Sequence, residues 1–347
     1  MPKLSYKTSG VDIDKANATK NEMAKSLNNS GNARVLNKAG AFATLFDGSF
    51  PEYQEPVLVF KTEEPGSKQK LALKHRSIDT ICFDLINHLV NDAIVMGAKP
   101  LSVQDCIVCG KIDKEIILKM VSAFSKACKE NDCVLTGGET SEQPSVLAIG
   151  TYILTASIVG VVEKKKIIDG SKIQEGDVVL GLASRGIHTN GFSLVQKIME
   201  KSPEILKEKV DGKNFIESIL TPHFGYYNCL KDLFGNDGLV GLAHITGGGI
   251  KENLNRILPE NLNAEIDIGK IKILNIFKVL KKFGDLEDND MMRTFNMGVG
   301  MTAVVKKDFV DTIQSHLKKC GVESYEIGRV VKGNKQVILK EVLNWFN

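Results

Sequence analysis

The stretch FDLINHLVNDAIVM, residues 83–96, decides most of what the sequence indicates about the fold. Its apolar side chains recur at the three-, four- and seven-residue spacing of one helix face. Gly97 and Pro100 follow, and both residue types end helices. We therefore expect an amphipathic helix over 83–96. Its apolar face comprises Phe83, Ile86, Leu89, Val90, Ala93 and Ile94.

Short apolar runs and helical patterns surround this helix. The turn-rich stretch 169–172 has no apolar periodicity, and a chain of 347 residues exceeds what one core usually organises. We therefore predict two domains, 1–168 and 169–347. Strands are expected at 56–60, 101–108, 133–135, 153–162, 177–182, 299–305 and 336–339, and further helices at 16–27, 114–129, 193–199, from Gly249, at 275–283 and at 309–319. These elements mix without strict alternation, which favours an α+β fold over a doubly wound sheet. The charged stretch 200–215 is expected at the surface.

The composition excludes several classes of protein. Hydrophobic residues make up 43% and charged residues 25%, with a net charge of only +3 and scattered lysines. Nucleic-acid binding is therefore not expected. No run approaches the roughly 18 apolar residues of a membrane span, and the N-terminus lacks the apolar stretch of a signal peptide. Seven cysteines, an odd number, suit reduced thiols, so we expect a cytoplasmic protein without a membrane partner. Cys106 and Cys109 have the spacing of half a redox or zinc site, but β-branched residues between them favour a buried strand.

The polar side of the 83–96 helix carries Asp84, Asn91 and Asp92. Asp84 and Asn91 are two turns apart, about 10 Å, and nearly eclipsed. Asp92 lies near the helix end, where the dipole disfavours negative charge, and a bound cation would offset that cost. The alternative interpretation is an exposed polar face.

Further acids follow at Asp105, Glu139 and Glu142. Hard oxygen ligands from several segments are what Mg²⁺ takes, usually together with substrate phosphates. Several such acids in one expected domain indicate a magnesium site more strongly than Gly137-Gly138-Glu139 alone.

Three glycine-containing segments in the second half suit anion binding. The turn 244–249, HITGGG, precedes a helical pattern, so its backbone N–H groups are available to an anion. The turn 186–191, GIHTNG, offers polar side chains, and 293–300 joins Arg293 to glycines before a strand. The alternatives are a plain structural turn and a surface arginine. No triad order, Walker loop, zinc-binding His-Glu-x-x-His or dinucleotide fingerprint is present, so phosphate with magnesium is the chemistry indicated.

Together these segments resemble the motifs of the phosphoribosylformylglycinamidine cyclo-ligase family, in order over nearly the whole chain. The resemblance is carried by residues 6–14, 137–142, 160–163 with 168–170, 186–194, 244–249 with 252–253, and 293–300. It implies two α+β domains in a homodimer, with N-terminal strands paired across it into a central barrel. It also implies an ATP-dependent ligase of purine biosynthesis. ATP would phosphorylate the formyl oxygen of formylglycinamidine ribonucleotide, and the amidine nitrogen would then close the ring of aminoimidazole ribonucleotide.

By matching position, the resemblance also implies site residues. Catalytic roles fall to Asp92, Asp105 and Glu139, and metal ligation to Glu63, Asp92 and Glu139. ATP contacts fall to Lys68, Asp84, Asn91, Gly137, Gly138 and Thr140. The substrate and its phosphate would meet His188, Thr189, Asn190, Gly191, His244, Thr246, Gly247, Gly248, Gly249, Arg293 and Asn296. Mg²⁺ is the expected cofactor, and a requirement for a monovalent cation stays open.

One segment departs from the family pattern. The family's glycine loop reads GTDGVGTK, whereas residues 61–68 read KTEEPGSK. Glu63 would replace the aspartate as a metal ligand with one extra methylene, and Glu64 and Pro65 remove a glycine and a backbone donor. The family's histidine before Asp79 is Ile78 here. The altered loop leaves open a catalytically silent nucleotide-binding dimer, and single motifs leave open another synthetase or kinase of the same superfamily.

Overall fold

The computed structural model describes residues 18–19, 22–23, 32–37 and 41–346. The expected motif at 6–14 lies outside these residues, and the helical pattern over 16–27 lies largely outside them. The described chain forms two compact units. The first unit ends at Glu163 and is interrupted by Ile94–Ala98, which belong to the second unit together with the residues from Lys164 onward.

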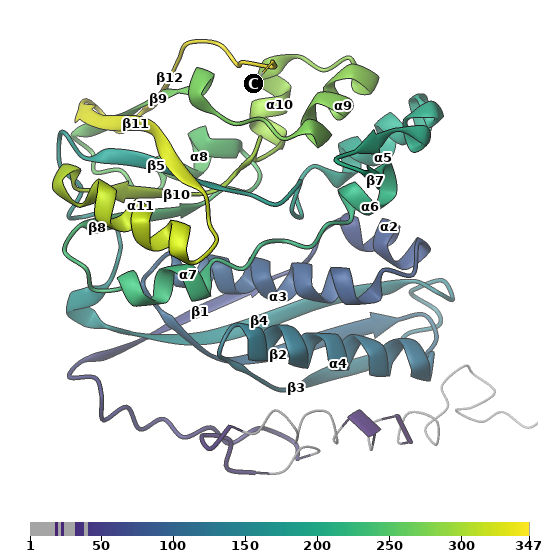
Figure 1. Ribbon diagram of the computed structural model, residues 1–347. Helices are drawn as coiled ribbons and strands as arrows, with labels where there is room; N and C mark the ends of the chain where they lie inside the picture. Colours follow the sequence, from purple (N-terminus) through teal and green to yellow (C-terminus); the bar gives the residue numbers. More distant parts are fainter. Residues whose placement is uncertain (1–17, 20–21, 24–31, 38–40, 347) are drawn as a thin grey trace, which may run out of the picture. The chain divides into compact units, whose positions relative to one another are not determined.

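The first unit is a four-stranded mixed sheet with helices along one face (Figure 1). Its strand order is β1 (Pro56–Glu63), β4 (Tyr152–Glu163), β2 (Lys99–Cys109) and β3 (Val134–Glu142); β2 and β3 are parallel and the other pairs antiparallel. The helices are α2 (Lys68–Lys74), α3 (Ile78–Ile94) and α4 (Lys114–Glu130). Asp113 caps α4 by accepting from the backbone of Glu115 and Ile116.

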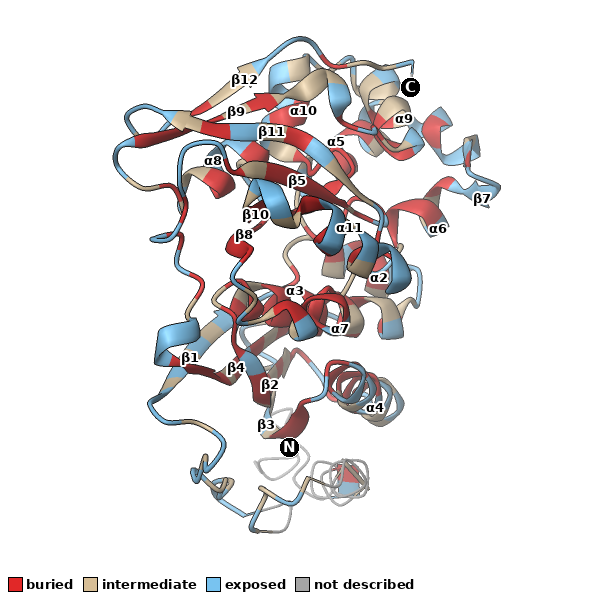
Figure 2. Cartoon of the chain, turned by 60° about the vertical axis from the view of Figure 1, so that its left-hand side comes forward, coloured by how far each residue is buried: buried red, intermediate tan, exposed pale blue. Residues whose placement is uncertain are grey.

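Helix α3 contains most of the stretch 83–96 and is buried on nearly every side (Figure 2). It begins five residues earlier than expected, at Ile78. Asp84 and Asn91 are fully buried, and Asp92 is partly buried. The exposed polar face is therefore wrong for this helix. A buried polar group must be hydrogen-bonded or paired, so these side chains need partners inside the protein.

The second unit is built on a six-stranded mixed sheet. Its order is β12 (Val337–Lys340), β9 (Leu262–Asp267), β11 (Ser324–Lys332), β5 (Val178–Ala183), β10 (Val299–Val305) and β8 (Leu239–His244), with only β12 and β9 parallel. Its α-helices are α5 (Phe192–Lys201), α6 (Phe215–Ile219), α7 (Tyr227–Leu230), α8 (Gly249–Asn255), α9 (Asn275–Gly284), α10 (Asp288–Thr294) and α11 (Val310–Lys319). A small hairpin joins β6 (Lys209–Val210) to β7 (Lys213–Asn214).

Two expectations need correction. The stretch 200–215 is not only surface, because Ile205, Val210 and Phe215 are buried; the lysines between them conceal this in the sequence. Gly137 and Gly138 lie inside β3 instead of following a strand. A Cβ on Gly138 would lie 1.9 Å from the Asp105 carbonyl oxygen, so the parallel pairing of β2 with β3 requires glycine there.

The architecture is mixed α/β with two mixed sheets. Cys106 and Cys109 lie on strand β2, as expected, and all seven cysteines are free thiols. Within the described ranges, no helix combines the length and apolar character needed to cross a membrane.

Candidate functional site

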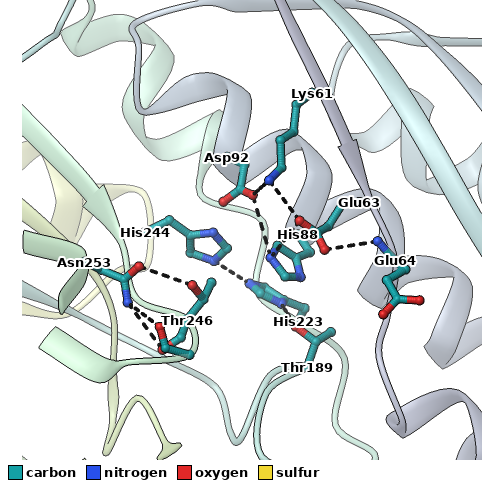
Figure 3. A network of polar contacts seen from close by, with 11 residues as sticks. Lys61, Glu63, Glu64, His88, Asp92, Thr189, His223, His244, Thr246 and Asn253 are labelled. Atoms are coloured by element: carbon teal, nitrogen blue, oxygen red, sulfur yellow. Dashed lines mark hydrogen bonds and ion pairs between the residues drawn. The ribbon is translucent and has the colours of Figure 1, made fainter. Parts of the chain in front are cut away.

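A lysine joins two predicted metal ligands in the first unit (Figure 3). Lys61 and Glu63 are two residues apart on β1, so their side chains leave the strand on the same face. The Lys61 Nζ atom lies 3.0 Å from Glu63 Oε2 and 3.0 Å from Asp92 Oδ2. In the described structure the charge of Asp92 is thus paired with the side chain of Lys61, and its role as a metal ligand stays a prediction. Partial burial lowers the pKa of Lys61, but hydrogen bonds to Glu63 and Asp92 outweigh it, and the pKa is raised overall.

His88 completes this cluster from α3, one turn before Asp92. Its Nε2 atom lies 3.9 Å from Glu63 Oε2 and 3.8 Å from Asp92 Oδ2. Sequence reasoning missed both His88 and Lys61. The i, i+4 spacing of His88 and Asp92 was the available signal, because it places both side chains on one helix face.

Lys68 and Asp84 form a fully buried ion pair. Lys68 Nζ lies 2.8 Å from Asp84 Oδ1 and 2.8 Å from Oδ2, and both side chains are 0% exposed. Burial lowers the pKa of Lys68, and Asp84 opposes that change. In the described structure the Lys68 ammonium thus neutralises Asp84. Both residues stay predictions as parts of an ATP site.

Asp105 and Glu139 lie on the paired strands β2 and β3. Asp105 is opposite Gly138, and Glu139 is the next residue along β3. Burial raises the pKa of Asp105 to about 7; a hydrogen bond to its own backbone opposes the rise, and the Glu139 charge adds to it. The predicted ligands Glu63, Asp92 and Glu139 do not form one group with ligand atoms within 4.8 Å of each other among the described residues.

Three buried histidines gather in the second unit. His223 Nε2 lies 2.9 Å from His244 Nε2, and Thr189 Oγ1 lies 3.5 Å from His223 Nδ1 (Figure 3). The rings of His188 and His223 stack with centroids 3.9 Å apart and planes 23° apart. Two stacked rings cannot both direct a lone pair at one metal ion without turning, so the geometry favours a ring stack over a three-histidine metal site. Sequence reasoning missed His223, which lies outside every quoted motif.

Asn296 ties the predicted substrate turns together. Its Nδ2 group donates to the carbonyls of Gly186 (2.9 Å) and Ile187 (3.2 Å). Its Oδ1 atom accepts from Ser184 Oγ (2.9 Å) and the Gly298 N–H (2.8 Å). Because these bonds use both amide hydrogens and the carbonyl oxygen, Asn296 acts by positioning the 186–191 turn.

The three glycines of 247–249 have different structural reasons. Gly249 begins α8 with φ +62°, and a Cβ there would lie 1.8 Å from the Met292 carbonyl oxygen. A Cβ on Gly248 would meet the Glu252 side chain, whereas Gly247 has only the Asn190 Nδ2 atom at 3.5 Å. Gly247 is therefore the position where the backbone is open to close approach. Asn253, which lies beside Thr246 in Figure 3, holds this turn by donating from Nδ2 to the carbonyls of Gly247 (3.1 Å) and Gly249 (2.9 Å).

Arg293 lies at the surface beside this turn. Its Nη2 atom is 3.4 Å from Glu252 Oε1, and both side chains are exposed. Arg293, Lys251 and Gly248 line a hollow of about 310 Å³ together with Glu252. The arginine is thus both a surface ion-pair partner and part of a hollow that offers two cations.

Comparison with known proteins identifies the family. Residues 52–162 match the N-terminal domain, and residues 174–340 the C-terminal domain, of the AIR synthase related protein family. The phosphoribosylformylglycinamidine cyclo-ligase of Bacillus thuringiensis subsp. konkukian (strain 97-27) is 40% identical over 95% of this chain and 96% of its own length. This chain belongs to the cyclo-ligase family. The cyclo-ligase of Prochlorococcus marinus (strain MIT 9301) is 38% identical over 97% of this chain and 98% of its own.

Solved structures of more distant proteins share the cyclo-ligase fold. A hydrogenase maturation protein, HypE, in complex with ATP matches with a TM-score of 0.64 and covers 90% of this chain and 88% of its own, at 16% identity. Identity this low shows the fold alone. The family assignment therefore rests on the cyclo-ligase relatives and the two domain matches.

Proposed function

We propose that this cyclo-ligase closes the imidazole ring of formylglycinamidine ribonucleotide with ATP, giving aminoimidazole ribonucleotide in purine biosynthesis. The observation that carries the proposal is the likeness to curated cyclo-ligases over 95% of the chain. The enzyme forms a carbon–nitrogen bond. A likeness of this extent favours the cyclo-ligase over a different synthetase or kinase of the same superfamily.

The proposed reaction has two steps. The formyl oxygen attacks the γ-phosphorus of ATP, the bond to ADP breaks, and an iminophosphate forms. The amidine nitrogen then attacks the former formyl carbon, phosphate leaves, and loss of a proton from nitrogen completes the ring. Both steps depend on positioning and charge neutralisation more than on a protein nucleophile, which suits a chain whose sequence contains no nucleophilic triad.

The acidic groups of the first unit are the proposed ATP and magnesium side. Carboxylate oxygens of Glu63 and Asp92 converge on one cation, and Asp105 and Glu139 are neighbours, so the donor set suits Mg²⁺. When bound, Mg²⁺ supplies neutralisation of phosphate charge. We assign the ATP side to Asp92, Asp105, Glu139, Glu63, Lys68, Asp84, Asn91, Gly137, Gly138 and Thr140. Among these, Lys68 and Asp84 act as a buried pair that positions α2 against α3.

The turns of the second unit are the proposed substrate side. Gly247 and Arg293 are suited to the ribonucleotide phosphate, because one offers open backbone and the other lines a hollow with Lys251. Thr189, Asn190 and Gly191 stand in the turn that Asn296 anchors, and His188 and His244 flank His223. Thr246, Gly248 and Gly249 shape the second turn.

We further propose a cytoplasmic homodimer built on the first unit's sheet. The face of this sheet opposite α3 and α4 exposes Leu58 (45%), Phe60 (70%) and Ile153 (38%). Large exposed apolar side chains on neighbouring strands mark interaction surfaces. Pairing of two such faces is the proposed route to the central barrel.

A single assay tests the activity. Purified protein receives Mg-ATP and formylglycinamidine ribonucleotide, and the release of ADP is followed together with the aminoimidazole product. We expect both products in equal amounts. ATP binding without either product would favour a catalytically silent nucleotide-binding dimer, and ADP formation that needs no formylglycinamidine ribonucleotide would favour a different superfamily kinase.

The variant Asp92→Asn tests the assigned site. Asn keeps the shape but removes the charge shared with Lys61, so we expect turnover to fall at least tenfold, which corresponds to about 1.4 kcal/mol. The thermal midpoint should move by only a few degrees, because the asparagine oxygen can still accept from Lys61 and Lys61 keeps its ion pair with Glu63. A loss of turnover that is fully explained by a loss of folded protein contradicts the assignment.

A further inference from the structure

The cluster of Lys61, Glu63 and Asp92 between β1 and α3 contains a positive charge that belongs to the protein itself. Glu63 and Asp92 come from different elements, β1 and α3, yet both approach the same Lys61 Nζ atom at 3.0 Å. Two carboxylates this close to one point repel each other unless a cation lies between them. The ammonium therefore occupies the position, between two oxygen donors, that a metal ion would need.

We infer that Lys61 is a tethered cation that competes with divalent metal for Glu63 and Asp92. This inference rests on the proposed function, because that proposal assigns the two carboxylates to the magnesium site. Lys61 lies within β1, two residues before the strand ends, and is paired with Ile158 of β4, so the backbone holds it beside the carboxylates. A divalent ion that takes both carboxylates as ligands must move the ammonium aside.

Charge and hydration make this competition effective. The two carboxylates alone carry two negative charges, whereas together with the ammonium they carry only one. A divalent ion is therefore attracted to half the charge that it would meet on the bare carboxylates. Mg²⁺ also gives up its water reluctantly, whereas the ammonium is already in hydrogen-bonding position and is only partly exposed. His88 lies within 4 Å of both carboxylates and offers no oxygen donor. The consequence is a carboxylate pair that is held in place without metal and binds a free divalent ion weakly.

The test measures metal binding in the absence of nucleotide. Mn²⁺ alone is the probe, and its dissociation constant is followed by electron paramagnetic resonance for wild type and for Lys61→Met, which keeps a long unbranched side chain without the charge. We expect Lys61→Met to bind Mn²⁺ at least tenfold more tightly. Adding Glu63→Gln to Lys61→Met should remove the gain, because it removes one of the two ligands.

The matched control is Lys119→Met. Lys119 also lies on the first unit and pairs with an acid of α3, Asp79, but at 3.3 Å on an exposed surface. Its Mn²⁺ affinity should equal that of wild type. Lys61→Gln serves as a second neutral variant and should show the same gain as Lys61→Met.

Unchanged Mn²⁺ affinity in both neutral variants, each with a cooperative thermal transition, would overturn the inference. Product formation is measured separately on wild type. A wild type that forms no aminoimidazole product removes the proposed function but leaves a tightened Mn²⁺ site in Lys61→Met as evidence for the tethered cation. Full activity combined with unchanged metal affinity removes the tethered cation alone.

Discussion

Lys68 and Asp84 are residues that a protein interior can hold only as a pair. Each would be costly to bury alone, and both are 0% exposed with Nζ–O distances of 2.8 Å. Removal of one partner takes an opposite charge away from a buried ionic group. This dependence makes the pair a sensitive measure of how the first unit is held together.

We expect Lys68→Met to destabilise the protein by about 3–5 kcal/mol in urea unfolding, because Asp84 is left without its cation. The double variant Lys68→Met with Asp84→Leu should recover much of the loss, since no buried charge remains. Lys197→Met, which removes an exposed pair with Glu200, is the control and should unfold like wild type. A loss no larger than that of the control contradicts the buried pair.

Asp105 gives a pH dependence of the opposite sign to an ordinary carboxylate. Its pKa is raised to about 7 in the folded state from the usual 3.8, because burial disfavours the charge. The folded protein therefore holds more protons than the unfolded chain between these values, and this group's contribution to stability falls as pH rises from about 4 to 7. Asp105→Asn should be more stable than wild type at pH 8, by roughly 2–4 kcal/mol, with little difference at pH 4.

The measurement is urea unfolding at both pH values in the presence of a chelator. Asp169→Asn is the control, because hydrogen bonds from Ser171 lower the pKa of Asp169. Asp169 contributes to the free energy of unfolding above pH 3.8, and this contribution is lost as the pH falls below that value. Asp169→Asn should therefore be less stable than wild type at pH 8. The same sign for both variants at pH 8 refutes the assignment for Asp105.

At the scale of the element, the long apolar patterns predicted the fold best. Strand β1, helix α4 and strand β10 were expected close to their observed bounds. Helix α4 has helical apolar spacing over 17 residues, whereas the strands are short apolar runs rich in valine, too short for a typical helix. Strands β9 and β11 were missed. Leu262–Asp267 alternates apolar and polar residues over its whole length, so the sequence did contain a signal for β9. Ser324–Lys332 alternates only in part, and its pairing with β5 and β9 is a long-range property.

The sequence indicated which residue types belong to the candidate site better than it indicated which of them contact each other. Asp92 and Glu63 were predicted as metal ligands, which stays a prediction; the structure shows both of them paired with Lys61, which no spacing rule identifies. His223 reaches His244 only because separate loops of the second unit converge. Such contacts depend on the packed structure, which explains why motifs along the chain do not contain them.

The glycine turn before α8 separates a packing role from a binding role. Gly249→Ala should destabilise the protein by several kcal/mol, because its φ of +62° is strained for alanine and the new Cβ would lie 1.8 Å from the Met292 carbonyl oxygen. Gly247→Ala should fold with a thermal midpoint close to wild type, since the new Cβ would lie 3.5 Å from Asn190 Nδ2, an ordinary contact distance. Its KM for the ribonucleotide should rise severalfold. Equal thermal midpoints for the two variants contradict this distinction.

At the scale of the whole molecule, the exposed sheet face of the first unit predicts the oligomeric state. Phe60→Glu should shift the protein from dimer to monomer in sedimentation velocity, because a charge on an apolar pairing surface must be desolvated on association. Leu206→Glu is the control: Leu206 is also exposed, at 45%, but lies in the second unit. A dimer that survives Phe60→Glu, or that Leu206→Glu dissociates equally, places the interface elsewhere.

The path of the chain between the two units constrains how they can be recombined. Ile94–Ala98 belong to the second unit, where the Met96 carbonyl accepts from the Ile168 N–H at 3.1 Å and Gly97 lies against Ile168 and Lys166. A hybrid gene spliced at 163/164 would give the second unit a foreign copy of these five residues. Hybrids between relatives should therefore exchange 94–98 and 164–347 together. Hybrids that divide them should give a lower expression yield, because residues 94–98 would no longer match residues 166–168.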